Sequence, residues 1–191
     1  MIKAIIFDCY GVLTTEGWLP FKHEYFDHDP ALFQEAENLA IRVGAGHMGY
    51  DQFITDIAQL AGTSEQEARR RIETHTPNTQ LFNYIQEELK PHYKLGFLSN
   101  AGNDMLTRLF TSEQIALFDE IHLSFQTGHV KPEAEAYVGI ARNLGCQPEE
   151  CIFIDDQERY CAGAEAVGMH AIVYKTTDQL CAQLTPLLPH S

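Results

Sequence analysis

The fold of this chain is decided by the stretch Lys3-Ala4-Ile5-Ile6-Phe7-Asp8-Cys9-Tyr10-Gly11-Val12-Leu13. A short apolar run ends at an acid, Asp8, and a glycine follows three residues later. An apolar run bounded by turn residues predicts a buried strand over residues 2–7. A carboxylate at the carboxyl end of such a strand lies where open α/β sheets bind ligands, although the same acid could simply start a turn. Asp8 is therefore a candidate site residue that needs support from the rest of the chain.

From residue 93 onward, the chain alternates between short apolar runs and amphipathic segments. We expect strands at 93–98, 120–123, 151–154 and 171–174, and helices at 103–110, 133–144, 159–167 and 178–188. Such alternation is typical of a parallel sheet with right-handed crossover connections. The sequence therefore predicts an α/β fold.

Residues 14–85 have helical periodicity and contain no strand-like run. We expect four helices there: one at 31–43, one at 51–61, one after the capping-box pair Ser64 and Glu67, and one from Pro77 to about Lys90. An insert after the first strand would cover the carboxyl edge of the sheet as a cap. We therefore divide the chain into a core of residues 1–14 and 86–191 and a helical cap of residues 15–85.

Charge and cysteine content restrict the classes of partner. The 191-residue chain has 13 Lys and Arg against 27 Asp and Glu, a net charge of −14, which would repel a nucleic acid backbone. A small phosphorylated substrate stays compatible, because it needs only a local positive site or a metal. Five cysteines without a CxxC pair favour a reducing compartment, so we expect a cytoplasmic protein. We expect no membrane partner, since no apolar run has the length of a span.

Polar residues follow several of the predicted strands: Asp8, Ser99-Asn100, Lys131 and Asp155-Asp156. Each one alone is typical of a turn, a solvated loop or a helix cap. Together they form a chemically coherent set, in which Asp8 is a nucleophile that accepts a phosphoryl group. Ser99, Lys131 and the backbone amides after Asp8, such as that of Cys9, could hold phosphoryl oxygens. The acid pair beside Asp8 could hold Mg²⁺.

Four segments resemble the four motifs of the haloacid dehalogenase superfamily, namely FDCYGVL, LSNAG, HVKPEAEAY and FIDDQE. Within it, GHMGYDQF and KPEAEAY resemble bacterial sugar-phosphatase-like members of the α-glucose-1-phosphate phosphatase type. The resemblance implies a Rossmann-like three-layer core with a C1-type cap, a Mg²⁺ cofactor and Asp8 as nucleophile. It also implies phosphate ligands at Ser99, Asn100 and Lys131, and metal ligands at Asp8, Asp156, Asp155 and the Tyr10 backbone carbonyl.

The sequence departs from the common phosphatase pattern at Tyr10, where many members carry a second aspartate as general acid and base. A phenol with a pKa near 10 is ionised in roughly a thousandth of molecules at neutral pH, so it could donate a proton but is a poor base. Three hypotheses stay open. The first is a Mg²⁺-dependent phosphatase of a small metabolite, such as a sugar phosphate. The second is a catalytically weak member that binds a phosphorylated ligand or a partner, and the third is a 2-haloacid dehalogenase.

Two further patterns have a plainer interpretation. Residues 44–49 fit the GxGxxG dinucleotide fingerprint, but they follow a helix rather than a strand, which favours a connection between cap helices. Four histidines lie in the insert, and their spacing matches no metal-ligand pattern: His23, His28, His47 and His75. We expect these histidines on the surface or in a substrate pocket.

Overall fold

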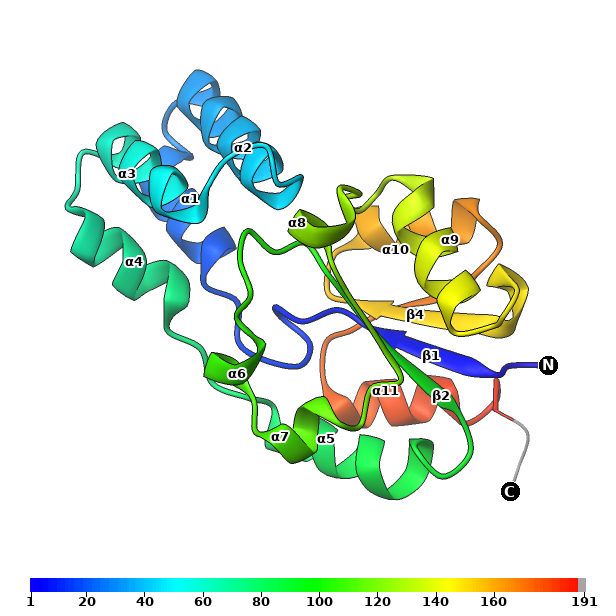
Figure 1. The fold of residues 1–191 in the computed structure, drawn as a ribbon. Coiled ribbons are helices and arrows are strands. Elements are labelled where there is room, and N and C mark those ends of the chain that lie inside the picture. Colours follow the sequence, from blue (N-terminus) through cyan, green and yellow to red (C-terminus); the bar gives the residue numbers. More distant parts are fainter. Residues whose placement is uncertain (189–191) are drawn as a thin grey trace.

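The computed structural model describes residues 1–188, which form a five-stranded parallel sheet with a helical insert (Figure 1). The strands are β1 (Ala4–Phe7), β2 (Lys94–Ser99), β3 (Glu120–Leu123), β4 (Cys151–Asp155) and β5 (His170–Val173). Their order across the sheet is β3-β2-β1-β4-β5, so β1 lies at its centre. The predicted α/β fold with a parallel sheet is confirmed.

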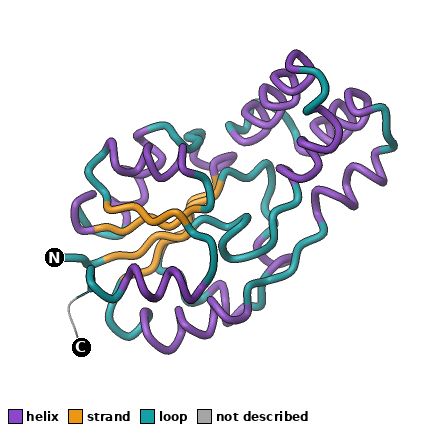
Figure 2. The backbone as a smooth tube through the Cα atoms, turned by 180° about the vertical axis from the view of Figure 1, so that it is seen from behind, coloured by secondary structure: helices purple, strands orange, loops and turns teal. Residues whose placement is uncertain are grey.

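Helices cover both faces of the sheet, which makes three layers (Figure 2). Ile5 and Phe7 of β1 pack on one face, and Ala4 and Ile6 pack on the other, because successive side chains of a strand point to opposite sides. The first face is covered by α5 (Thr79–Tyr84), its π-helical continuation Ile85–Leu89, and α11 (Thr177–Leu184). The second is covered by α9 (Ala134–Asn143) and α10 (Glu158–Ala166).

Short helical turns complete the core. They are α6 (Leu106–Leu109), α7 (Ser112–Ile115), α8 (Ser124–Thr127) and the 3-10 turn Pro148–Glu150. The segment predicted as one helix over 103–110 is therefore helical only in its second half. Among residues 1–188, no helix has both the length and the hydropathy needed to cross a membrane.

The cap consists of four helices with an apolar cluster of its own. They are α1 (Trp18–Phe26), α2 (Pro30–Gly44), α3 (Tyr50–Ala61) and α4 (Glu65–Glu73). Asp29 caps α2 by accepting hydrogen bonds from the amides of Ala31 and Leu32. Ser64 accepts from the amide of Glu67, but the Glu67 carboxylate pairs with arginines, so only half of the predicted capping box forms.

The identity of the four insert helices differs from the sequence prediction. Helix α1 is not among the predicted helices; its Pro20 lies in the first turn, where proline costs no hydrogen bond. The helix after Pro77 was assigned to the cap, but Leu81 and Phe82 belong to the apolar cluster of the sheet. The predicted core and cap boundaries stay a prediction, and we propose moving the one at residue 85 to the Pro77–Thr79 segment.

The two segments that connect cap and core run side by side. The amide of Thr15 donates to the Thr76 carbonyl (3.1 Å), and the amide of Thr76 donates to the Thr15 hydroxyl (2.9 Å). Asn78 continues the pairing, with its amide donating to the Leu13 carbonyl (2.9 Å). These bonds fix the two connecting segments to each other.

Candidate active site

Three of the predicted site residues lie at the carboxyl ends of the three central strands. Asp8 follows β1, Asn100 follows β2, and Asp155 ends β4. The amide of Asp8 donates a hydrogen bond to the carbonyl of Ile154 (2.9 Å), so the register of β1 and β4 places Asp8 beside Asp155. The topology alone therefore brings together residues that are far apart in the sequence.

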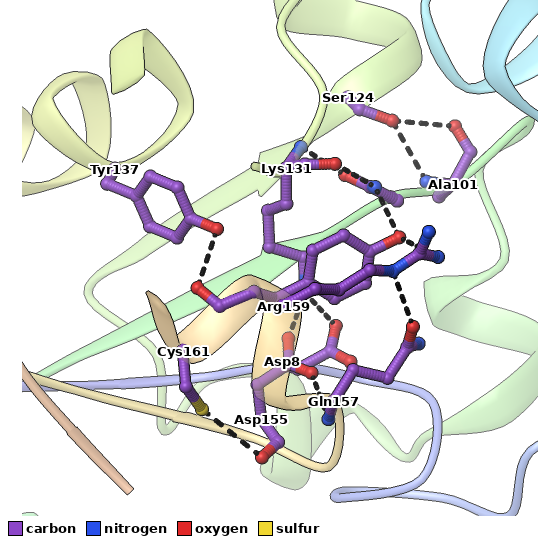
Figure 3. Close-up of polar contacts among 11 residues, drawn as sticks. Asp8, Ala101, Ser124, Lys131, Tyr137, Asp155, Gln157, Arg159 and Cys161 are labelled. Carbon is purple, nitrogen blue, oxygen red and sulfur yellow. Dashed lines mark hydrogen bonds and ion pairs between the residues drawn. The ribbon is translucent and has the colours of Figure 1, made fainter. Parts of the chain in front are cut away.

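Lys131 bridges these two carboxylates (Figure 3). Its Nζ lies 2.7 Å from Asp8 Oδ1 and 2.6 Å from Asp155 Oδ2. The side chains are almost fully buried, with exposed fractions of 1% for Lys131, 6% for Asp8 and 0% for Asp155. Burial lowers the pKa of Lys131, but Asp155 and Asp8 together raise it above its usual range, so the lysine stays charged. Burial raises the pKa of Asp8. The Lys131 charge lowers this pKa, whereas the neighbouring Asp155 carboxylate raises it further.

Asp156 offers the free carboxylate of the site. Both oxygens of Asp155 are engaged, one by Lys131 and one by the amide of Gln157 (2.9 Å), whereas Asp156 Oδ1 is buried and has no hydrogen-bond partner within residues 1–188. Burial, with Asp155 contributing, raises the pKa of Asp156 to about 7. One oxygen from each of Asp8, Asp155 and Asp156 lies within 4.8 Å of the others, an arrangement that suits a divalent cation.

Gly11 makes room for this carboxylate. Its φ is +83°, and a side chain there would collide with the carboxylate of Asp156. The loop after β1 therefore requires glycine at this position for both its backbone conformation and its close approach to Asp156.

The predicted phosphate ligands have different surroundings. Asn100 holds Lys131 in place, since its Oδ1 accepts from the Lys131 amide (2.8 Å) and its Nδ2 donates to the Lys131 carbonyl (3.0 Å). Ser99 Oγ is buried and has no hydrogen-bond partner among the described residues. Cys9 is also buried, and its carbonyl accepts from the amides of Leu13 and Thr14, which closes the loop after β1.

Tyr10 lies half-buried against a cap histidine. The ring centres of Tyr10 and His75 are 5.0 Å apart. Burial raises the pKa of Tyr10 well above its usual value, so the fraction of ionised phenol that could act as a base at neutral pH is even smaller than the sequence suggests. His75 Nδ1 donates to the Thr15 carbonyl (2.9 Å), so this histidine also joins the connecting segments.

A cavity of about 340 Å³ lies between the cap and the carboxyl edge of the sheet. Asp8, Tyr10, Asn100 and Lys131 line it from the core, whereas Ser99, Cys9, Asp155 and Asp156 do not reach its surface. The sequence did not identify Tyr160, whose ring lies 4.9 Å from Lys131 Nζ and whose hydroxyl accepts from Arg159 (2.8 Å). The signal in the sequence that could have identified Tyr160 is its position in the first turn of α10, the helix that follows the acid pair.

The two plainer interpretations agree with the structure. Residues 44–49 connect α2 to α3 and do not follow a strand. Within residues 1–188, the carboxylates of Asp8, Asp155 and Asp156 form a group suited to a metal, and no such group includes a histidine. Of the four cap histidines, His75 lines the cavity.

Comparisons with known proteins identify relatives similar in sequence and in fold. The sequence is similar to Phosphatase MT3486 of Mycobacterium tuberculosis (strain CDC 1551 / Oshkosh), with 27% identity over 199 residues that cover 93% of this chain and 89% of that protein. The fold is similar to that of a HAD-family enzyme of Bacteroides thetaiotaomicron solved with magnesium and inorganic phosphate, with 24% identity, a TM-score of 0.68, and coverage of 93% and 96% of the two chains. It is also similar to that of 2-haloacid dehalogenase from Pseudomonas syringae pv. Tomato DC3000, with 17% identity, a TM-score of 0.64, and coverage of 98% and 100%.

Both structural likenesses establish the fold alone. The family profile described as haloacid dehalogenase-like hydrolase matches residues 2–168, which include the predicted motifs and the insert. The chain therefore belongs to the haloacid dehalogenase-like hydrolase family.

Proposed function

We propose that this protein is a Mg²⁺-dependent phosphatase of a small phosphorylated metabolite, with sugar phosphates among the candidate substrates. The observation that carries the proposal is the buried group of Asp8, Lys131 and Asp155 beside an unpartnered Asp156 oxygen. The acid pair favours a phosphatase over a dehalogenase, because attack on carbon has no use for a metal site.

Five free cysteines support our further proposal of a cytoplasmic location.

In the proposed reaction, a carboxylate oxygen of Asp8 attacks phosphorus, and the bond to the leaving oxygen breaks. The leaving group takes a proton from solvent, and water then attacks phosphorus of the aspartyl-phosphate, which releases inorganic phosphate and restores the Asp8 carboxylate. Lys131 neutralises charge on the phosphoryl oxygens. Asn100 positions Lys131 through its two backbone hydrogen bonds. The Ser99 hydroxyl, which has no hydrogen-bond partner among the described residues but does not line the cavity, is the proposed donor to a phosphoryl oxygen.

The residues around Asp8 fit a magnesium ion. Asp8 and Asp156 would hold it with the backbone carbonyl of Tyr10, whereas Asp155 has both oxygens engaged and serves chiefly to hold Lys131. When bound, Mg²⁺ supplies positive charge that stabilises the negative charge developing on the phosphoryl group.

Removing Asp156 is expected to weaken metal binding. The Asp156→Ala variant should need at least about tenfold more Mg²⁺ for half-maximal activity, because loss of an outer partner of a metal ligand already costs that much. The measurement is activity against Mg²⁺ concentration, and excess chelator should abolish activity in the wild type. Glu158→Ala, which removes the exposed acid at the start of α10, is the matched control and should leave the Mg²⁺ dependence unchanged.

Hydrolysis of an aryl phosphate and of a 2-haloacid, each with Mg²⁺ and with chelator, separates the three hypotheses. A phosphatase acts on the aryl phosphate and needs the metal. Release of halide at full rate in chelator would instead indicate a dehalogenase. Inactivity towards both compounds, together with binding of inorganic phosphate, would indicate a phospho-ligand-binding protein.

Tyr10 is expected to limit turnover. Absence of a positioned acid–base group costs typically 10²–10⁴-fold, so Tyr10→Asp should raise the rate by at least about tenfold on esters with poor leaving groups. We also expect the wild type to prefer substrates whose leaving group needs little protonation, such as sugar 1-phosphates, acyl phosphates and aryl phosphates. The measurement is kcat on an alkyl and on an aryl phosphate.

Tyr10→Phe is the matched control for this substitution, because it keeps the ring and removes the hydroxyl. It should change kcat by less than about threefold if the phenol takes no part in proton transfer. A large loss in both variants would mean that Tyr10 itself donates a proton or binds substrate.

A further inference from the structure

Glu37 on α2 joins the cap to the core at the edge of the cavity. Its Oε2 lies 2.6 Å from Nζ of Lys22 in the cap, and its Oε1 accepts from Arg159 Nη1 in the core (2.9 Å). The other guanidinium nitrogens of Arg159 donate to the Tyr160 hydroxyl (2.8 Å) and to Gln157 Oε1 (3.0 Å). Arg159 thus uses all three of its nitrogens within the protein.

Glu73, the last residue of α4, repeats this arrangement elsewhere on the cavity wall. Its Oε1 lies 3.0 Å from Nη1 of Arg69 in the cap, and its Oε2 lies 3.0 Å from Nη1 of Arg108 in the core. Glu37, Glu73, Arg108 and Arg159 all line the cavity. Each cap glutamate is therefore shared between one cap cation and the core arginine that it contacts.

The charged side chains of the cavity wall do not favour a second negative charge on the substrate. Among the described residues, the lysine and arginine side chains that line the cavity are Lys131, Arg108 and Arg159, and each is paired with a carboxylate. Glu16 and Glu133 add two carboxylates to the wall; Glu16 accepts from the backbone amides of Trp18 and Leu19, and Glu133 lies 3.7 Å from the ring of His129, which is outside the wall. Beyond the phosphate position, the described part of the chain therefore gives the cavity no lysine or arginine without a carboxylate partner.

Aromatic rings form much of the remaining wall. On the cap side, the ring of Phe53 lies between those of Trp18 (centres 5.6 Å apart) and Tyr50 (5.9 Å apart). On the core side, Tyr10 packs against His75. All five rings line the cavity. Flat apolar faces of this kind suit an aromatic leaving group or the C–H face of a sugar ring.

We propose that the cavity selects phosphomonoesters whose leaving group is an uncharged ring, and that Glu37 and Glu73 disfavour leaving groups with a second negative charge by holding Arg159 and Arg108 in ion pairs and placing their own carboxylates on the wall. This inference rests on the proposed phosphatase function and defines its substrate class. Like charges placed together in a binding site are strongly unfavourable, which is how a pocket rejects a competitor of equal size.

The test compares 4-carbamoylphenyl phosphate with 4-carboxyphenyl phosphate, which have nearly the same shape and differ in one charge. The wild type should have a kcat/KM at least about tenfold higher for the carbamoyl ester. Glu73→Gln leaves Arg108 without its carboxylate and should bring the ratio close to one by raising activity on the carboxyl ester. Glu24→Gln, which removes a cap carboxylate that pairs with Arg71 outside the cavity, should leave the ratio unchanged.

Binding supplies a second readout that does not need turnover. The chain contains one tryptophan, and Trp18 lines the cavity, so its fluorescence reports occupancy. In the Asp8→Asn variant, we expect the same preference for the carbamoyl ester in titrations followed by this fluorescence. Equal or tighter binding of the carboxyl ester, or a ratio that Glu73→Gln does not change, would overturn the inference. Inactivity of the wild type on both esters with the binding preference intact would count against the phosphatase proposal alone.

Discussion

Replacing Asp8 with asparagine is expected to lower hydrolysis of a phosphomonoester at least about a thousandfold while the fold is retained. The amide has the shape of the carboxylate but is barely nucleophilic, so the phosphoryl group has no acceptor. Its oxygen can still accept a hydrogen bond from Lys131, which in the wild type lies 2.7 Å from Asp8 Oδ1. The measurement is kcat with saturating Mg²⁺, together with the thermal midpoint.

Asp56→Asn is the matched control, since it makes the same change on the surface of α3, where Asp56 accepts from Gln52 (2.7 Å). It should keep wild-type activity. Activity of Asp8→Asn within tenfold of the wild type would remove Asp8 from the mechanism, whereas a large fall in the thermal midpoint would mark it as a structural acid.

Replacing Lys131 with methionine is expected to damage both stability and activity. The variant leaves Asp8 and Asp155 facing each other without a cation in a site where all three side chains are nearly inaccessible. Removing one partner of a buried ionic group typically costs about 3–5 kcal/mol in the free energy of unfolding. Activity should fall as well, because the phosphoryl oxygens lose their neutralising ammonium.

The loss of stability should depend on pH with a definite sign. Burial already raises the pKa of Asp8, and loss of Lys131 raises it further, so the folded state then favours the protonated carboxyl. A carboxyl group of this kind destabilises the fold as pH rises through its folded-state pKa. The difference in free energy of unfolding between Lys131→Met and wild type should therefore be larger near pH 8 than near pH 5.

Lys90→Met is the control for this substitution, because Lys90 pairs with Asp119 at 2.7 Å on the surface, with side chains 32% and 40% exposed. Surface pairs are worth about 0–1 kcal/mol, so this variant should unfold almost as the wild type does at both pH values. A loss in Lys131→Met that is equally small would show that Asp8 and Asp155 do not depend on the lysine.

The sequence alone predicted the parts of the fold that depend on short-range pattern. Asp8 and the acid pair Asp155-Asp156 each follow an apolar stretch. Such stretches form strands whatever their partner strands are. Parallel pairing then brings the strand ends together, so the sequence also predicted that Asp8, Asn100 and Asp155 belong to one region. These predictions needed no knowledge of long-range contacts.

What the sequence could not predict depends on pairing between distant segments. Glu37 meets Arg159 across 122 residues, and no local signal distinguishes either residue from an ordinary charge on a helix surface. The packing of helix α5 against the sheet could not be predicted either, because its periodicity shows that one face is buried without showing what covers it. The sequence also could not show that Asp155 holds Lys131 while Asp156 stays available for a metal. This difference depends on which carboxylate oxygens contact Lys131 and the Gln157 amide.

The paired connecting segments have a consequence for how such a protein can be remodelled. Thr15 and Thr76 are hydrogen-bonded although 61 residues separate them, so the insert leaves the core and returns to it at nearly the same point. Exchanging the insert for one of another length then changes little in the geometry of the core, because the ends to be joined are already adjacent. Selectivity and chemistry can therefore be engineered separately, with a new insert grafted between Thr15 and Thr76 and the strand ends left unaltered.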